Sequence, residues 1–408
     1  MSGVGSTEPP GSGGAGFAGA GAGNSELPGH ALVVGMGLSG EAAAGALQRR
    51  GIEVVTADRR DGTDEDLALL EGVDVLVKSP GVPGDNPLVA EARSRGVPVW
   101  SEVELGYRLL PGGVRLVGVT GTKGKTTTVR LLGAMLSAAG WPVALAGNEQ
   151  PPLSEVADEV EPGTWLVCEL TSFQLEDVHT LALDIALLLN LEPDHLDRHG
   201  TFEVYRDAKL RIFERAGTVV EWGPDEPLPA EPRIRGAHNR ENAAAATRVA
   251  RELGVPEEAI AEALVSFPGV EHRLEPVAEI DGVLYVNDSK ATNVAAAVRA
   301  LAAYADEPVR LIAGGRGKGQ SFEPLATVVG PNVKAVYLIG EAADELATAI
   351  GERAIRAGDL AAAVSRAVAE ASPGDVVLLS PACASFDQFR DFADRGEEFR
   401  RLVQNLEG

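Results

Sequence analysis

The stretch GVTGTKGKTTT, residues 118–128, has the composition of a phosphate-binding loop. It follows an apolar run and opens a helical pattern, which places it at a helix N-terminus. Gly121 and Gly124 would let backbone N–H groups close around phosphate oxygens there. Lys125 can reach the β- and γ-phosphates, and the Thr126 hydroxyl can ligate Mg²⁺. Valine replaces the first glycine of the usual G-x-x-x-x-G-K-[ST] pattern, so the loop is a shortened variant. A chance Gly-Lys turn is the alternative, which the flanking strand and helix patterns disfavour.

Two further side chains follow apolar runs that predict buried strands. Glu169 ends TWLVCE, and His195 lies just past DIALLLNLEPDH. Parallel strands form their ligand crevice at their carboxyl ends, so both side chains are candidates for a metal or base site. Mg²⁺ prefers oxygen ligands, which makes Glu169 the more natural ligand of the two. Either residue alone is better interpreted as structural, whereas the pair beside a phosphate loop indicates a site.

Three polar loops follow strand patterns in the second half of the chain. They are VNDSKATN at 286–293, AGGRGKGQSF at 313–322 and LLSPACASFDQFRDF at 378–392. Their composition suits a polar site better than a core, and the second suits anion capture. Each could be an ordinary βα loop. Three of them on one sheet edge favour a rim that faces a ligand.

The N-terminal ALVVGMGLSGEAAAGAL, residues 31–47, carries the G-x-G-x-x-G spacing of a dinucleotide site. Asp58, at the end of EVVTAD, fits the acidic residue that reads a ribose in nicotinamide enzymes. A dehydrogenase is therefore one interpretation. No catalytic acid/base pair of a dehydrogenase accompanies the motif, so it shows only that a phosphate-bearing ligand can approach a helix N-terminus.

Short Val/Ile/Leu-rich runs alternate with Ala-rich helical segments from residue 31 onward, which predicts an α/β fold with mainly parallel sheets. The 408 residues exceed the length at which one core usually stops growing. We predict three domains, 30–113, 114–269 and 270–408. The first 30 residues hold 10 glycines and no apolar stretch after a basic start, so we predict a disordered tail over 1–29 and no signal peptide.

Charge and composition limit the kinds of partner that the protein can bind. The formal net charge is −24, which argues against nucleic acid or an anionic membrane as a partner. No apolar run reaches the roughly 18 residues of a membrane span. The two cysteines, Cys168 and Cys383, lie in apolar segments and indicate buried thiols in a reducing cytoplasm.

Nine stretches together resemble the Mur ligase family and occur in family order, and the resemblance extends over residues 31–408. They are GTKGKTTT, ELTSFQLE, LNLEPDHLDRH, YRDAKLRIF, GAHNRENAAAA, EHRLE, NDSKATN, GGRGKG and SPACASFDQFRDFADRGEEF. The resemblance implies three Rossmann-like domains, the central one with a P-loop ATPase fold. It implies an ATP- and Mg²⁺-dependent ligase of peptidoglycan biosynthesis, which adds D-glutamate to UDP-N-acetylmuramoyl-L-alanine through an acyl phosphate. We expect a monomer.

The resemblance also implies residue roles. The resemblance assigns catalytic roles to Lys125, His195 and Lys209. Lys209 matches a carbamylated lysine that ligates a second Mg²⁺ in the family. From spacing alone, Lys209 would be a solvated charge on an amphipathic helix. The metal ligands are Thr126, Glu169, His195 and Lys209. The ATP site comprises Gly121, Thr122, Lys123, Gly124, Lys125, Thr126, Thr127, Asn239, Asn242, Arg273, Asp288 and Lys290. The UDP-substrate site comprises Gly37, Leu38, Ser39, Asp58, Arg59, Ser79, Pro80, Gly81 and Asn148. The D-glutamate site comprises Lys318, Ser385 and Phe392.

Two features depart from the family pattern. AGNEQPP replaces the Gly-Asn-Ile-Gly turn that contains Asn148, and the connection between FERA and GAHN is shorter than the family's. Three rivals stay open: a folylpolyglutamate synthase, a dehydrogenase fused to a kinase, and a nucleotide-binding protein without turnover. The first has its phosphate loop near the N-terminus, whereas here a βα domain precedes it.

Overall fold

The computed structural model describes residues 27–406, so most of the predicted tail lies outside the described residues. Contacts between Cα atoms divide the chain into two compact units. The first runs to Pro227 and includes Ala244–Ile260, and the second comprises Leu228–Ala243 and the chain from Ala261 onward. The described residues form three sheets, of four, five and six strands. The predicted α/β class with mainly parallel sheets is confirmed.

The first unit begins with a four-stranded parallel sheet of order β2-β1-β3-β4. β1 is buried along nearly its whole length, which explains its continuous apolar run. The strands are β1 (His30–Val34), β2 (Glu53–Ala57), β3 (Val75–Lys78) and β4 (Val99–Ser101). The helices are α1 (Leu38–Arg49), η1 (Arg59–Asp61), η2 (Leu67–Leu70), α2 (Pro87–Ser94) and α3 (Glu102–Leu109).

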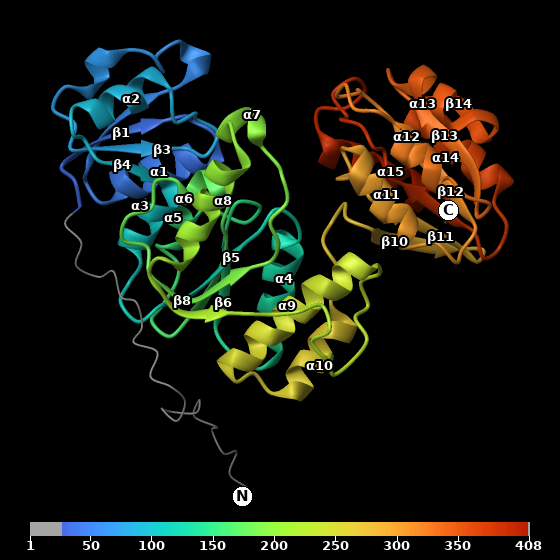
Figure 1. Ribbon diagram of the computed structural model, residues 1–408, viewed down its shortest axis with the longest axis horizontal. Coiled ribbons are helices and arrows are strands. Elements are labelled where there is room, and N and C mark those ends of the chain that lie inside the picture. Colours follow the sequence, from blue (N-terminus) through green and yellow to red (C-terminus); the bar gives the residue numbers. More distant parts are fainter. Residues whose placement is uncertain (1–26, 407–408) are drawn as a thin grey trace, which may run out of the picture. The chain divides into compact units, whose positions relative to one another are not determined.

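The same unit contains a five-stranded parallel sheet of order β6-β7-β5-β8-β9. Figure 1 draws helices α4 and α8 to either side of β5. The strands are β5 (Arg115–Thr120), β6 (Val143–Gly147), β7 (Trp165–Glu169), β8 (Leu183–Leu188) and β9 (Ala216–Val220). The helices are α4 (Lys125–Ala138), α5 (Leu153–Val156), α6 (Ser172–Leu175), α7 (Leu196–His199), α8 (Phe202–Leu210) and η3 (Arg211–Phe213), followed by α9 (Ala237–Leu253) and α10 (Glu257–Ser266), which the two units share.

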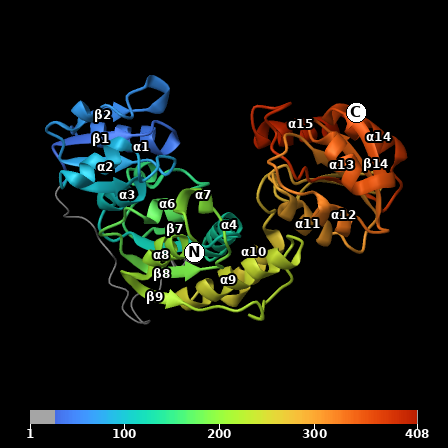
Figure 2. The ribbon, with the colours of Figure 1, turned by 45° about the horizontal axis from the view of Figure 1, so that its top comes forward.

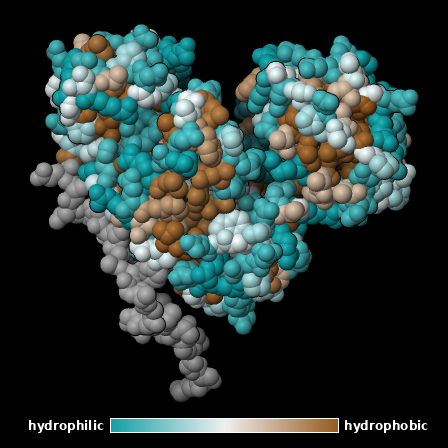
Figure 3. Space-filling model, in the orientation of Figure 1, coloured by the Kyte–Doolittle hydropathy of each residue, from teal (hydrophilic) through white to brown (hydrophobic). Residues whose placement is uncertain are grey.

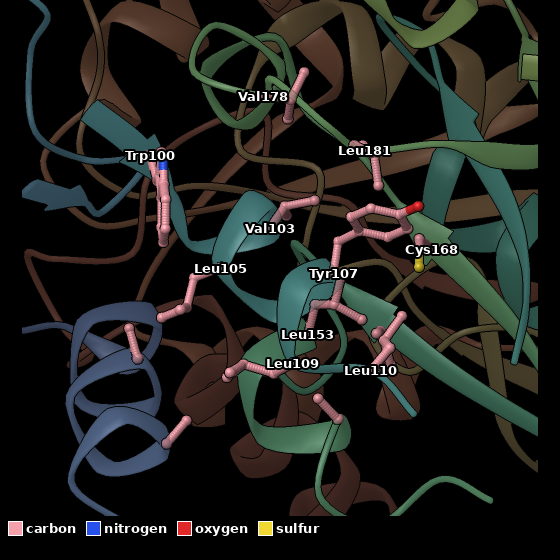
Figure 4. Packing of buried hydrophobic residues seen from close by; sticks show 14 of the residues in the cluster. Trp100, Val103, Leu105, Tyr107, Leu109, Leu110, Leu153, Cys168, Val178 and Leu181 are labelled. Carbon is pink, nitrogen blue, oxygen red and sulfur yellow. The ribbon is translucent and has the colours of Figure 1, made fainter. Parts of the chain in front are cut away.

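One hydrophobic cluster joins these first two sheets. It includes Ala31 from β1 and Leu116 from β5, with helix α3 between them. In Figure 4, Tyr107 of α3 points toward Cys168 of β7. A Cβ added at Gly106 would lie 2.6 Å from Leu153 Cγ, so α3 and α5 touch through a glycine. The two sheets therefore pack as one compact unit around a common core.

The second unit holds a six-stranded sheet of order β10-β11-β15-β12-β13-β14. Only the β10–β11 pair is antiparallel among its described pairs. Figure 2 shows α13, α14 and α15 gathered around this part of the chain. The strands are β10 (Glu275–Ile280), β11 (Val283–Asn287), β12 (Val309–Gly314), β13 (Val333–Ile339), β14 (Ala354–Gly358) and β15 (Val376–Leu379). The helices are α11 (Val294–Ala302), α12 (Glu323–Val328), α13 (Ala343–Ile350), η4 (Gly351–Arg353), α14 (Leu360–Glu370) and α15 (Phe392–Gln404).

The surface of the first unit is partly apolar. Hydrophobic residues form a stripe in Figure 3 where Figure 1 labels α7 and α8, and both Leu196 and Val204 of these helices are exposed. Within residues 27–406, no helix combines the length and apolarity needed to cross a bilayer.

Candidate functional site

The predicted phosphate loop connects β5 to α4. Gly121 has a φ of 155° and Gly124 a φ of 87°, values that glycine adopts without strain, and α4 begins at the next residue, Lys125. Lys125 Nζ donates to the carbonyls of Gly121, at 3.0 Å, and Thr122, at 3.1 Å. The lysine thus lies folded over the loop at a helix N-terminus. A helix N-terminus with a lysine beside it suits an anion such as a phosphate group.

Side chains from the neighbouring segments hold the loop in place. The Thr122 hydroxyl lies 2.9 Å from the hydroxyl of Tyr205, a buried residue of α8. The backbone N–H of Lys123 donates to Asn190 Oδ1, in the chain that follows β8, at 2.9 Å. The loop conformation therefore depends on groups that precede and follow His195 in the chain.

Lys209 is buried, and the solvated charge that spacing alone predicts is wrong. It is 2% exposed, and its Nζ donates to the Gly121 carbonyl at 2.7 Å. Burial, and then the nearby Lys125 charge, lower its pKa to about 7. The ring of Tyr205 lies 5.0 Å from the ammonium. The amine is therefore neutral in much of its population at neutral pH, and it lies at the phosphate loop.

Glu169 is 1% exposed at the end of β7. Asn148 Nδ2 donates to its Oε1 at 3.2 Å, whereas its Oε2 is buried and has no hydrogen-bond partner among the described residues. A buried carboxylate oxygen without a donor is costly unless a cation or water meets it, so Glu169 fits a Mg²⁺ ligand. The Thr126 hydroxyl, the other oxygen ligand predicted, donates to Glu149 Oε2 at 3.2 Å.

His195 lies in the loop after β8, directly before α7. Its φ of 53° is left-handed, and its side chain is 51% exposed. Its ring meets Phe173 edge-on with centroids 5.0 Å apart, and Phe173 stacks on His199 at the same distance. His195 is therefore a surface residue between β8 and α7.

The first glycine loop and the 79–81 turn lie together at the end of the first sheet. Ser79 Oγ donates to the Gly35 carbonyl at 2.5 Å. A Cβ at Gly40 would lie 2.0 Å from the same carbonyl, so only glycine allows this approach. Beside the loop, Gly37 and Leu38 are exposed, Leu38 at 82%.

Asp58 is held by its own neighbours. It accepts from the backbone N–H of Met36 at 2.5 Å and from Arg60 Nε at 2.8 Å. Arg60 keeps the pKa of this carboxyl well below its usual range. The predicted Arg59 is exposed, and the cation on Asp58 is its neighbour Arg60.

In the second unit, the loops after β11 and β15 meet. Ser380 Oγ donates to Asp288 Oδ2 at 2.8 Å, and burial raises the pKa of Asp288 to about 7. Lys290 Nζ lies 3.7 Å from the ring centroid of Phe392. The structure therefore brings together residues from two of the three predicted polar loops.

The remaining predicted residues of this unit make other contacts. Lys318 Nζ donates to Thr292 Oγ1 at 3.4 Å, which joins the second polar loop, 313–322, to the first, 286–293. Ser385 is buried. Asn242 donates to Asn239 at 3.2 Å on α9, and Arg273 bonds through its backbone to Val270.

Several residues of the site escaped prediction. Arg395 is fully buried and donates to Ser289 and to the Cys383 carbonyl, which ties two polar loops together. Arg198 donates to the carbonyls of Pro80 and Gly81, and so connects α7 to the turn at residues 79–81. Both arginines lie inside stretches that carry the family resemblance. Neither was predicted, because no residue spacing indicates that an arginine will bond backbone carbonyls.

The comparisons decide the family. The Mur ligase middle domain matches residues 119–226, and the Mur ligase glutamate ligase domain matches residues 272–383. UDP-N-acetylmuramoylalanine--D-glutamate ligase of Anaeromyxobacter dehalogenans is 42% identical over 447 residues, covering 91% of this chain and 96% of that protein. The chain is a Mur ligase.

Other relatives agree with this membership. The protein of the same name from Geobacillus kaustophilus is 40% identical, with 92% of this Mur ligase and 97% of the relative covered. Among solved structures, UDP-N-acetylmuramate-alanine ligase of Thermotoga maritima matches with a TM-score of 0.60 at 19% identity, over 93% of this chain and 99% of that one. The MurF ligase of the same organism, in complex with ADP, matches with a TM-score of 0.56 at 18% identity, over 84% and 91%. Both likenesses show the fold of this Mur ligase.

Proposed function

We propose that this Mur ligase joins D-glutamate to UDP-N-acetylmuramoyl-L-alanine and hydrolyses ATP to ADP and phosphate in doing so. The observation that carries the proposal is that Lys125 and Lys209 both donate to the Gly121 carbonyl of the phosphate loop. The named relatives at 42% and 40% identity support the choice of substrates.

The chemistry has two transfers. An oxygen of the terminal alanine carboxylate attacks the γ-phosphorus of ATP, ADP leaves, and an acyl phosphate forms. The amine of D-glutamate then attacks the acyl carbon, and the tetrahedral intermediate expels phosphate and loses a proton to leave the amide. Two anions meet in the first transfer, so cations have to neutralise the γ-phosphate and the carboxylate together. Lys125 and the N-terminus of α4 supply positive charge at that point.

Mg²⁺ would bind to Thr126 and Glu169, and bound Mg²⁺ supplies charge neutralisation on the phosphates. The buried, unpartnered Oε2 of Glu169 supports this assignment. His195 would face the acyl-acceptor region. Lys209 would act as a carbamate, because a neutral amine can add carbon dioxide and release a proton, which leaves a carboxylate-like ligand. Its lowered pKa supports that step.

The other assignments are carried over from the family resemblance. The first glycine loop with Ser79, Pro80 and Gly81 would hold the UDP group. Lys318, Ser385 and Phe392 would hold D-glutamate. The three sheets support the division at residues 113 and 269 as three domains. We further propose a monomer that acts in the cytoplasm, where buried thiols such as Cys168 and Cys383 stay reduced.

The proposal is tested by phosphate release. Release should need ATP, Mg²⁺, UDP-N-acetylmuramoyl-L-alanine and D-glutamate together, and omission of any one should reduce it to the background of the enzyme-free mixture. Equal release with L-glutamate, or with a folate in place of the UDP-sugar, would contradict the proposal and favour a folylpolyglutamate synthase.

A further inference from the structure

Glu149 is an acidic residue at the phosphate loop in a turn that departs from the family pattern. It follows Asn148, where the resemblance expects isoleucine in a Gly-Asn-Ile-Gly turn. Its Oε2 accepts a hydrogen bond from Thr126 Oγ1 at 3.2 Å. The departure therefore places a carboxylate on the hydroxyl that is proposed to ligate Mg²⁺.

The backbone that carries Glu149 is pinned to the strand that ends in Glu169. Asn148 N donates to the Glu169 carbonyl at 3.1 Å, and a Cβ at Gly147 would lie 2.1 Å from that carbonyl. The Gly147 N–H donates to the Pro151 carbonyl at 3.0 Å, which closes the turn. Because β6 and β7 are neighbours, this turn opens at the same sheet edge as Glu169.

The hydrogen bond has a consequence for metal binding. A hydroxyl that ligates a cation uses a lone pair, so its proton needs an acceptor on the other side. Glu149 accepts the hydrogen bond that the Thr126 hydroxyl donates, and its carboxylate adds negative charge beside the metal position. Groups that orient a ligand in this way typically change metal affinity by about 10–100-fold.

We propose that Glu149 is a positioning residue for Mg²⁺: it fixes the Thr126 hydroxyl with its oxygen available to the metal and strengthens the binding of nucleotide-bound Mg²⁺. This inference rests on the proposed function, since it needs the Thr126 metal site. It applies to this chain because the family pattern has no acidic group at this position.

The test measures ADP binding by calorimetry with and without MgCl₂, for the full chain and two variants. Glu149→Ile removes the acceptor and the charge, and should weaken the Mg²⁺-dependent gain in ADP affinity by about tenfold. Glu149→Gln keeps an acceptor oxygen and should retain part of that gain. Neither change should weaken ADP binding without Mg²⁺, because each removes a negative charge beside the phosphates. The amount of bound Mn²⁺, measured by electron paramagnetic resonance, should be highest in the unchanged protein, lower in Glu149→Gln and lowest in Glu149→Ile.

Glu155→Gln is the matched control, because it removes a carboxylate from an exposed position six residues along the chain and should behave as the unchanged protein. A Mg²⁺-dependent gain that is unchanged in Glu149→Gln and Glu149→Ile overturns the inference. Equal weakening of ADP binding with and without Mg²⁺ also overturns it, because it assigns a purely structural role. If Glu149→Ile does not fold, Glu149→Gln alone decides. Failure of the unchanged protein to bind Mg²⁺ and ADP would instead contradict the proposed function.

Discussion

Lys209 shows how burial changes the chemistry of one side chain. Its amine is enclosed by the Gly121 carbonyl and the Tyr205 ring, and another cation, Lys125, lies close enough to disfavour its charge. A lysine whose pKa lies at about 7 is uncharged above that pH, whereas the same amine in an unfolded chain keeps its proton to about 10.5. Only the neutral amine reacts with carbon dioxide. The fold therefore lowers the pKa of this lysine toward neutral pH, which favours the amine form that can add carbon dioxide.

Lys209 should carry a carbamate that depends on pH. With ¹³C-labelled bicarbonate, we expect a carbamate signal at pH 8 that declines as the pH falls through 7, where the amine takes up its proton. Lys209→Ala should lack the signal and lose most of the ligase activity, and excess bicarbonate should not restore it. Lys334→Ala, at an exposed position, is the control and should keep both. Near-normal turnover of Lys209→Ala would remove the carbamate assignment.

Residue chemistry was partly predictable. Gly121, Gly124, Lys125 and Thr126 could be predicted, because a phosphate loop needs those residue types at fixed spacing. The contact of Arg60 with Asp58 was not predicted, because two adjacent arginines in a turn are equivalent in the sequence until the backbone directs one of them to the carboxylate. The assignment of Arg59 to the UDP-substrate site stays a prediction.

At the scale of elements, α7 connects two ligand loops of the first unit. Arg198 donates to the Pro80 carbonyl at 3.1 Å and to the Gly81 carbonyl at 3.2 Å. Its guanidinium also lies 4.7 Å from the Phe173 ring, whose edge contact is His195. The turn proposed for the UDP group and the loop that carries His195 are therefore held by one side chain.

Replacing Arg198 should disturb UDP-substrate binding more than ATP binding. Each lost hydrogen bond to a charged group is worth roughly 1.5–3 kcal/mol, so Arg198→Met should raise KM for UDP-N-acetylmuramoyl-L-alanine about tenfold or more. KM for ATP should change less than about twofold, because the bonds of Lys125 and Lys209 are untouched. Arg206→Met, which loses only a pair with the adjacent Asp207, is the control. Equal effects on both KM values would show that α7 acts on the whole unit.

Edge strands were harder to predict than central ones. The apolar runs of β5, β7 and β8 are central and buried, and they stand out in the sequence. β9 and β14 lie at sheet edges and consist mostly of exposed or half-buried positions, so their short AGTVV and AIRAG runs resemble connections. Each becomes a strand by pairing with the strand that precedes it in the chain, β9 with β8 and β14 with β13.

At the scale of the whole molecule, the two compact units divide the proposed ligand residues. All those assigned to the UDP group lie in the first unit, and all those assigned to D-glutamate lie in the second. The four tryptophans, Trp100, Trp141, Trp165 and Trp222, also lie in the first unit. Tryptophan fluorescence therefore reports the unfolding of that unit, while far-ultraviolet circular dichroism reports both.

UDP-N-acetylmuramoyl-L-alanine should stabilise the first unit selectively. At about a hundredfold excess over Kd, a ligand adds about 2.7 kcal/mol, which should raise the fluorescence-detected Tm by about 5–10 °C. Circular dichroism should show a second transition that does not move. D-glutamate alone is the control and should leave the fluorescence transition in place. A single transition shifted equally by both ligands would contradict this division.

The α/β class, the phosphate loop and the family could all be predicted from residue patterns, because βα alternation and glycine spacing are local properties. The burial of Lys209, the contact of Glu149 with Thr126 and the common core of the first two sheets became visible only in the folded chain. Each of these depends on contacts between segments far apart in the chain. Burial and proximity set the pKa of an amine and the acceptor of a hydroxyl, and neither quantity exists until the strands are paired.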